Sequence, residues 1–112
     1  MPVERWSDRI WMLALSREPD LTEDLDNLDA ALRKQSRMPD VVVDLSGVPS
    51  VTSSTLARLL RLRKRLAEES ASLVLAAPSD QVWLVFLTTG LDAVFRFRED
   101  TATALAELQL PE

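Results

Sequence analysis

Four consecutive hydroxyl side chains separate a strand-like segment from a helix-like one: Thr52, Ser53, Ser54 and Thr55. The apolar run of residues 41–45 and a turn containing Gly and Pro precede them, and a helical pattern begins directly behind them. At the start of a helix, unpaired backbone N–H groups and the positive end of the helix dipole favour an anion. Such a place suits a phosphate esterified to a serine as well as a bound phosphate. The alternative interpretation is a Ser/Thr helix cap, which these residues provide routinely.

Composition excludes most kinds of catalytic and metal site. The 112 residues contain no cysteine and no histidine. Their absence removes disulfides, thiolate chemistry, the commonest general base and the commonest transition-metal ligand. With only two glycines, Gly47 and Gly90, no Gly-rich phosphate-binding loop can be drawn. We therefore expect a protein that is not an enzyme, with no catalytic residue, no metal and no cofactor.

Charge and hydropathy limit the classes of partner and the cellular location that can be expected. The net charge of -5 argues against general nucleic-acid binding. The longest apolar stretch, residues 82–87, is far too short for membrane insertion, and residues 1–9 (MPVERWSDR) contain no apolar signal region. Hydrophobic residues make up 46% and charged residues 28%, as in globular proteins. We expect one cytoplasmic domain over residues 1–112, with its core at about 10–110.

Strand-like and helix-like segments alternate along the chain. The expected strands are residues 9–16, 41–45, 73–77 and 94–98; the expected helices are 20–35, 53–69, 79–90 and 101–108. Such alternation predicts an α/β fold, with a central, mostly parallel sheet of four or five strands covered by about four helices. The segment 41–45 is apolar except for Asp44, and 73–77 is apolar throughout, which predicts neighbouring interior strands; 94–98 should be an edge strand.

Several local features follow from side-chain spacing. Trp11, Leu13 and Leu15 should share one face of the first strand. Asp20 and Glu23 resemble a capping pair at the start of the first helix. The buried face of the second helix is expected to consist of Leu56, Leu59, Leu60 and Leu66.

Five basic residues gather on the second helix outside this apolar face: Arg58, Arg61, Arg63, Lys64 and Arg65. They raise the possibility of a nucleic-acid or lipid-headgroup site. The acidic balance of the chain and the absence of interleaved aromatic residues favour a solvated helix face or contact with an acidic protein partner.

The third helix has no polar face over residues 82–87. Helical spacing groups Val82, Val85, Phe86 and Thr89 on one side, and Trp83, Leu84 and Leu87 on the other. A helix that is apolar all round should be covered on both sides. The cover is either the N-terminal segment with Trp6 or a protein interface. On the second alternative, Trp83 or Leu87 is solvent-exposed in the single chain and covered by a partner, or by a second copy in a homodimer through residues 80–89.

Two stretches carry a family resemblance. Residues 41–66 (VVVDLSGVPSVTSSTLARLLRLRKRL) and 73–97 (LVLAAPSDQVWLVFLTTGLDAVFRF) resemble STAS domains, the family of anti-sigma factor antagonists. In that family a strand is followed by Asp-Ser-Ser-Gly or a variant and then a helix, and a partner kinase phosphorylates the first serine. The resemblance implies that Ser53 is the acceptor, with Ser54 and Thr52 as secondary candidates. Thr52 stands where typical antagonists have aspartate, and Thr55 where they have glycine.

The resemblance also implies a function. Unmodified Ser53 would permit binding to an anti-sigma factor or related serine kinase, and phosphorylated Ser53 would prevent it. The candidate partner-binding residues are Thr52, Ser53, Ser54, Thr55, Arg58, Trp83 and Leu87. Ser54 lies about 100° around the helix from Ser53 and is expected to face inward. The alternative function is a constitutive STAS-type scaffold or accessory subunit of a signalling assembly or lipid-transport complex, without phosphorylation.

Overall fold

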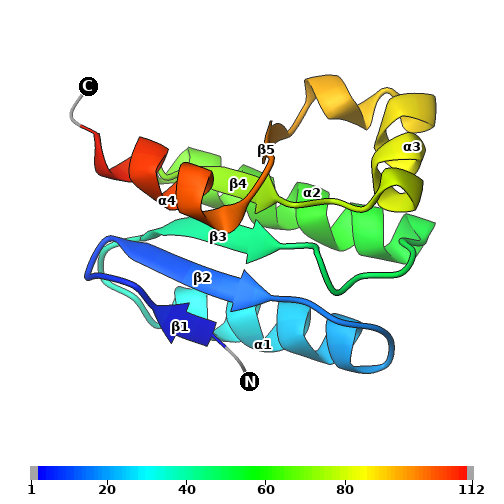
Figure 1. Ribbon diagram of the computed structural model, residues 1–112. Helices are drawn as coiled ribbons and strands as arrows, with labels where there is room; N and C mark the ends of the chain where they lie inside the picture. The colour runs from blue at the N-terminus through cyan, green and yellow to red at the C-terminus, as the bar shows by residue number, and fades with distance from the viewer. Residues whose placement is uncertain (1–2, 111–112) are drawn as a thin grey trace.

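The computed structural model describes residues 3–110, in which helices cover both faces of a five-stranded sheet (Figure 1). The strands lie side by side in chain order: β1 (Val3–Arg5), β2 (Ile10–Ala14), β3 (Asp40–Asp44), β4 (Leu73–Ala76) and β5 (Arg96–Arg98). The helices are α1 (Asp20–Arg33), α2 (Ser53–Glu68), α3 (Asp80–Thr89), the short 3₁₀ helix η1 (Leu91–Ala93) and α4 (Thr101–Gln109). β2 to β5 run parallel, and β1 pairs antiparallel with β2. This confirms the expected α/β fold, with β3 and β4 as neighbouring interior strands.

The core has two parts, one on each face of the sheet. Trp11, Leu13 and Leu15 are buried on one face, as their spacing predicted, together with the apolar sides of α1, α2 and α3. Val42 and Val74 point to the other face, where they pack against Ala104 and Leu105 of α4. Since side chains alternate along a strand, the interior strands can only be buried on both faces if they are apolar at every position. β4 and the central residues Val41–Val43 of β3 meet this requirement, and Asp40 and Asp44 at the two ends of β3 are only partly buried.

The N-terminal segment does not cover α3. β1 pairs with β2 at one edge of the sheet, while β5 forms the opposite edge. Trp6, directly after β1, is 47% exposed. The expectation that this segment shields the apolar third helix is therefore wrong. A strand of three residues is too short to show the alternation by which strands are recognised in a sequence.

Two helix details also differ from expectation. Asp20 and Glu23 do not cap α1; instead the carboxylate of Glu18 accepts hydrogen bonds from the backbone N–H (2.8 Å) and the hydroxyl (2.6 Å) of Thr22. In α2, Leu60 is 37% exposed, and Leu62 is buried in its place. Leu59, Leu62 and Leu66 recur at the i, i+3, i+7 spacing of one helix face, and Leu60 lies about 100° away from Leu59.

Candidate functional site

The connection between β3 and α2 determines where the hydroxyl cluster lies. Just after β3, the backbone N–H of Leu45 donates to the carbonyl of Ala76 (2.8 Å). A Cβ on Gly47 would come within 2.9 Å of the carbonyl oxygen of Leu15, so only glycine fits this approach to the chain after β2. Val48 is buried in the core. The connection thus carries the chain from the C-terminal end of β3 to the start of α2 (Figure 1).

Thr52 and Thr55 form the cap of α2. The N–H of Thr55 donates to Oγ1 of Thr52 (3.2 Å), the N–H of Thr52 donates to Oγ1 of Thr55 (3.4 Å), and the two hydroxyls lie 3.2 Å apart. This reciprocal pairing is a capping box, in which two orphan donors are satisfied at once. Thr55 is only 2% exposed. It therefore stabilises the turn from inside the protein.

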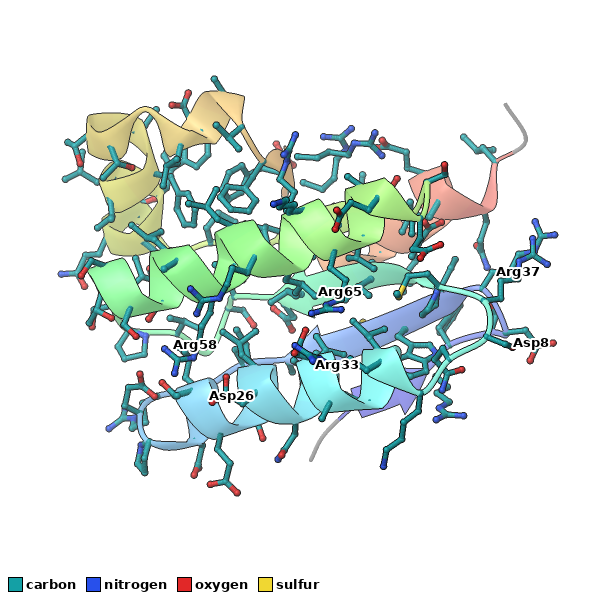
Figure 2. The ribbon with its side chains drawn as sticks, turned by 180° about the vertical axis from the view of Figure 1, so that it is seen from behind. Asp8, Asp26, Arg33, Arg37, Arg58 and Arg65 are labelled. Atoms are coloured by element: carbon teal, nitrogen blue, oxygen red, sulfur yellow. The ribbon has the colours of Figure 1, made fainter. Side chains whose placement is uncertain are left out.

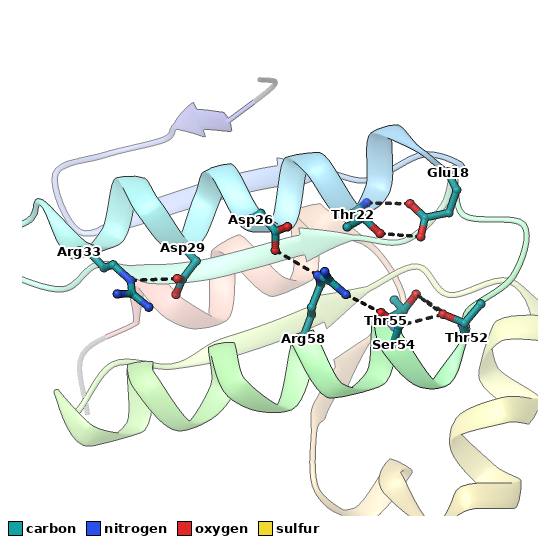
Figure 3. A network of polar contacts seen from close by, with 9 residues as sticks. All are labelled: Glu18, Thr22, Asp26, Asp29, Arg33, Thr52, Ser54, Thr55 and Arg58. Atoms are coloured by element: carbon teal, nitrogen blue, oxygen red, sulfur yellow. Dashed lines mark hydrogen bonds and ion pairs between the residues drawn. The ribbon is translucent and has the colours of Figure 1, made fainter.

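Ser53 is left free of the cap. It is the first residue of α2, its side chain is exposed, and its hydroxyl has no hydrogen-bond partner within residues 3–110. The expectation of a reachable Ser53 hydroxyl in the first turn is confirmed. Ser54 was expected to face inward, and this is wrong: Ser54 is exposed, and its Oγ accepts a hydrogen bond from Nη1 of Arg58 (Figure 3). One turn later on the same helix face, Arg58 provides a polar partner that holds the serine side chain at the surface.

Basic residues of α2 reach across to acidic residues of α1. Nε of Arg58 lies 3.0 Å from Oδ1 of Asp26, and Nε of Arg65 lies 2.8 Å from Oδ1 of Asp29. Asp29 also pairs with Arg33 on its own helix at 3.0 Å. The two helices lie side by side in Figure 2, and the groove between them has a volume of about 100 Å³. Two of the five basic residues thus contact a neighbouring helix rather than water alone.

Sequence reasoning did not single out Asp26 or Asp29. A signal for them existed in the i, i+3, i+7 spacing of Asp26, Asp29 and Arg33, which places them on one side of α1. Nothing in the sequence alone states which helix that side faces.

The outer face of α3 is the second candidate surface. Val82 and Phe86 are buried, and the ring of Phe86 packs edge-on against Phe97 at 4.9 Å between centroids. On the outside, Leu84 is 58% and Leu87 45% exposed, which confirms the expected exposure of Leu87. Trp83 is half-buried.

The aromatic contact and the caps explain how this helix is held. The Trp83 ring packs against Phe97 at 4.9 Å. Ser79 caps the start of α3 through the N–H of Val82 (3.3 Å), and Gly90 ends the helix in the left-handed conformation at φ 76°. Figures 1 and 2 both show α3 beside the N-terminal half of α2, so the helix that carries the exposed leucines lies next to the helix that begins with the hydroxyl turn.

Residues 3–110 contain neither a metal-binding cluster nor a membrane-spanning helix. No three acidic, His or Cys side chains come together there in an arrangement that could hold a metal ion. None of the helices described is long and apolar enough to cross a membrane.

Comparison with known proteins identifies the family. The family model described as "Mlab, STAS domain" matches residues 5–99. The chain belongs to the STAS domain family. This confirms the resemblance seen in residues 41–66 and 73–97.

Solved structures show the same fold. A candidate anti-sigma factor antagonist from Thermotoga maritima matches with a TM-score of 0.82 at 18% identity, over 97% of this chain and 94% of that one. An anti-sigma factor antagonist (STAS) domain protein from Planctomyces limnophilus matches with a TM-score of 0.71 at 24% identity, over 87% of this chain and 89% of that one. No curated protein matches this STAS domain significantly.

Proposed function

We propose that this STAS domain is a non-enzymatic partner-switching regulator, similar to an anti-sigma factor antagonist. In its unmodified form it binds an anti-sigma factor or a related serine kinase, and phosphorylation of Ser53 abolishes that binding. The observation that carries the proposal is the separation of tasks in one helical turn: Thr52 and Thr55 cap α2, and the neighbouring Ser53 hydroxyl is exposed and unbonded within the described chain. The two solved anti-sigma factor antagonists with the same fold support the class of partner.

A phosphate on Ser53 would be tolerated by the fold. It would add about -1.5 to -2 charges at neutral pH, beside backbone N–H groups and the positive end of the α2 dipole. The first turn of α2 contains no acidic residue that would repel it. A partner packed against the unmodified turn would meet a hydrated dianion, which costs desolvation and excludes the partner.

We assign the apolar part of the partner surface to α3. Leu87 and the half-buried Trp83 were expected there, and Leu84 is more exposed than either of the two. Apolar area stabilises a complex in proportion to what is removed from water, and a few central side chains contribute most of the binding energy. Changing Leu84 and Leu87 together to Gln should weaken partner binding at least about tenfold, with little change in thermal stability. Unchanged affinity would remove α3 from the partner surface.

The second candidate function is a constitutive scaffold or accessory subunit of a signalling assembly or lipid-transport complex. One observation favours it. Thr52 and Thr55 occupy the positions of the typical Asp and Gly, and their side chains bond each other in the cap. No carboxylate therefore stands next to Ser53, the candidate phosphorylation site, and the two threonines stabilise the start of the helix.

The decisive experiment is incubation of the full chain with ATP and a candidate serine kinase of the partner-switching type. The γ-phosphoryl group of ATP would pass to Oγ of Ser53 as the bond to the β-phosphate oxygen breaks; ADP leaves and the hydroxyl proton goes to a base of the kinase. Mass spectrometry should place the phosphate on Ser53, and Ser53→Ala should lose it. Ser54→Ala is the matched control, because it changes the adjacent exposed hydroxyl and should keep phosphorylation.

Binding measurements complete the test. Ser53→Asp should bind the same kinase or anti-sigma factor more weakly, with an unchanged melting temperature, whereas Ser53→Ala should bind like the wild type. If Ser53→Asp unfolds the domain or binds as tightly as the wild type, Ser53 is structural and the switch is wrong. A partner that binds equally well before and after incubation with kinase and ATP would favour the constitutive subunit.

A further inference from the structure

A chain of three polar side chains links the first turn of α2 to α1. Nη1 of Arg58 donates to Oγ of Ser54, and Nε of the same guanidinium donates to Oδ1 of Asp26 at 3.0 Å (Figure 3). The Arg58 side chain is 26% exposed, so its charge is partly shielded from water, whereas Asp26 is 60% exposed. Arg58 thus holds a serine hydroxyl and a loosely held carboxylate at the same time.

The charges around Arg58 leave a surplus of cations. The groove between α1 and α2 is lined by four arginines, Arg33, Arg58, Arg61 and Arg65, and by two aspartates, Asp26 and Asp29. Arg61 makes no ion pair within residues 3–110. Glu18, just before α1, is the further carboxylate whose charge Arg58 influences. An added anion at this place would therefore meet more positive than negative groove residues.

We propose that Arg58 is an internal receptor for a phosphate on Ser54. A phosphate monoester at this position would draw Arg58 away from Asp26 and be held against the surface of α2, whereas one on Ser53 would have the helix start but no guanidinium beside it and would face the partner. The two adjacent serines then differ in the effect of a phosphate. On Ser53 it changes binding of the partner protein, and on Ser54 it changes the contact between α1 and α2.

Helix geometry separates the two serines. Ser54 and Arg58 are four residues apart, so they lie one above the other on the same face. Ser53 is five residues from Arg58, and its side chain points about 140° away around the helix. A guanidinium binds the oxygens of a phosphate in pairs, with a geometry and charge that a single exposed carboxylate oxygen does not match. Exchange of Asp26 for a phosphate on Ser54 is therefore favoured.

This inference rests on the proposed function only in taking modification of the α2 turn as the signal. Its test needs no kinase. Phosphoserine is placed at position 53 or 54 of the full chain by suppression of a stop codon, and each phosphate is titrated by ³¹P NMR. The proposal predicts a second phosphate pKa about one pH unit lower at position 54 than at 53, because a bound cation favours the dianion.

Arginine variants identify the receptor. In the protein with phosphoserine at 54, Arg58→Met should abolish the difference between the two positions. Arg61→Met is the matched control, because Arg61 lines the same groove without contacting Ser54, and most of the difference should persist. Equal titration at positions 53 and 54, or a position-54 titration that Arg58→Met leaves unchanged, would overturn the proposal. Unfolding caused by phosphoserine at 54, detected by circular dichroism, would overturn it too, because a captured phosphate leaves the fold intact.

A second measurement uses the unmodified chain. The side-chain Nε–Hε NMR signal of Arg58 should move in Ser54→Ala and in Asp26→Ala, which each remove one of its partners, and stay in place in Ser53→Ala. A signal that moves only in Ser53→Ala would contradict the assignment. Failure of either measurement leaves phosphorylation of Ser53 by its kinase open to its own test.

Discussion

The helices α2 and α3 both begin with a hydroxyl cap, but α2 exposes polar residues to solvent and α3 exposes apolar ones. Each follows an interior parallel strand, and each is capped by a hydroxyl, from Thr52 in α2 and from Ser79 in α3. Just behind the cap, α2 exposes Ser53 and Ser54, whereas α3 exposes Leu84 and Leu87 in its second turn. The shared cap provides a stable start in both helices, and the residues behind it differ in the interaction they can make with a partner.

On the proposed function, this difference assigns partner binding to α3 and its regulation to the first turn of α2. An apolar side chain contributes binding energy whenever it is covered, and no modification of charge is available to it. A serine at a helix N-terminus contributes little area, yet one covalent change gives it two negative charges. On the proposed function, phosphorylation of the polar turn determines when the apolar face of α3 binds a partner, provided that the cap is independent of Ser53.

The largest contrast should appear between the inner and outer faces of α3. Phe86 is fully buried against Phe95 and Phe97, so Phe86→Ala should lower the free energy of unfolding by about 3–5 kcal/mol. Leu87→Gln on the exposed face should change it by no more than about 0.5 kcal/mol. Urea unfolding of both variants checks this. A loss of similar size in Leu87→Gln would mean that the outer face is part of the core of the monomer.

A smaller contrast should separate the cap from the switch within α2. Thr52→Ala removes the side-chain oxygen that accepts from the N–H of Thr55 and should cost about 0.5–2 kcal/mol. Ser53→Ala, one residue on, removes a hydroxyl without a partner among the described residues and should stay within about 0.5 kcal/mol. Thermal melts measured side by side decide between the two. Equal losses would show that Ser53 shares the capping role, and the separation of cap and switch would fail.

The fold was predictable because each element has its own periodic signal. Nearly continuous apolar runs marked the interior strands β3 and β4, and the helix expected over residues 79–90 agrees with α3 (Asp80–Thr89). β1 escaped because three residues carry no periodicity. Periodicity did not distinguish Leu60 from Leu62, because both leucines fit an apolar stripe and only packing decides which one is buried.

The sequence predicted where the candidate site lies in the chain, but not which distant residues contact it. The position of Ser53 at the start of α2 follows from the strand, turn and helix order. The contact of Arg58 with Asp26 joins residues 32 positions apart, and it depends on how α1 and α2 lie against each other on the sheet. The inward direction expected for Ser54 failed for the same reason, because the arginine that holds it outward is itself held by a neighbouring helix.

The helix starts of the molecule fall into two chemical classes. Hydroxyls cap α2 and α3, whereas carboxylates hold the starts of α1 and α4: Glu18 accepts from Thr22, and Asp100 accepts from the N–H of Thr103 at 2.6 Å. Hydrogen bonds from the Thr22 side chain and backbone lower the pKa of Glu18 below its ordinary value of 4.5. Those from Thr103 lower the pKa of Asp100 below 3.8.

The smallest predicted effect follows from this difference. A carboxyl group whose pKa is lowered by folding stabilises the folded state above its ordinary pKa, and this contribution is lost as the pH falls through the lowered value. The backbone amide NMR signals of Thr22 and Thr103 should therefore shift on acidification with midpoints below 4.5 and 3.8. Those of Thr55 and Val82, bonded to hydroxyls that do not titrate, should stay constant over the same range. A Thr55 signal that titrates with the other two would show that the α2 turn senses a carboxylate, and its start would then differ from the uncharged cap that the proposed switch requires.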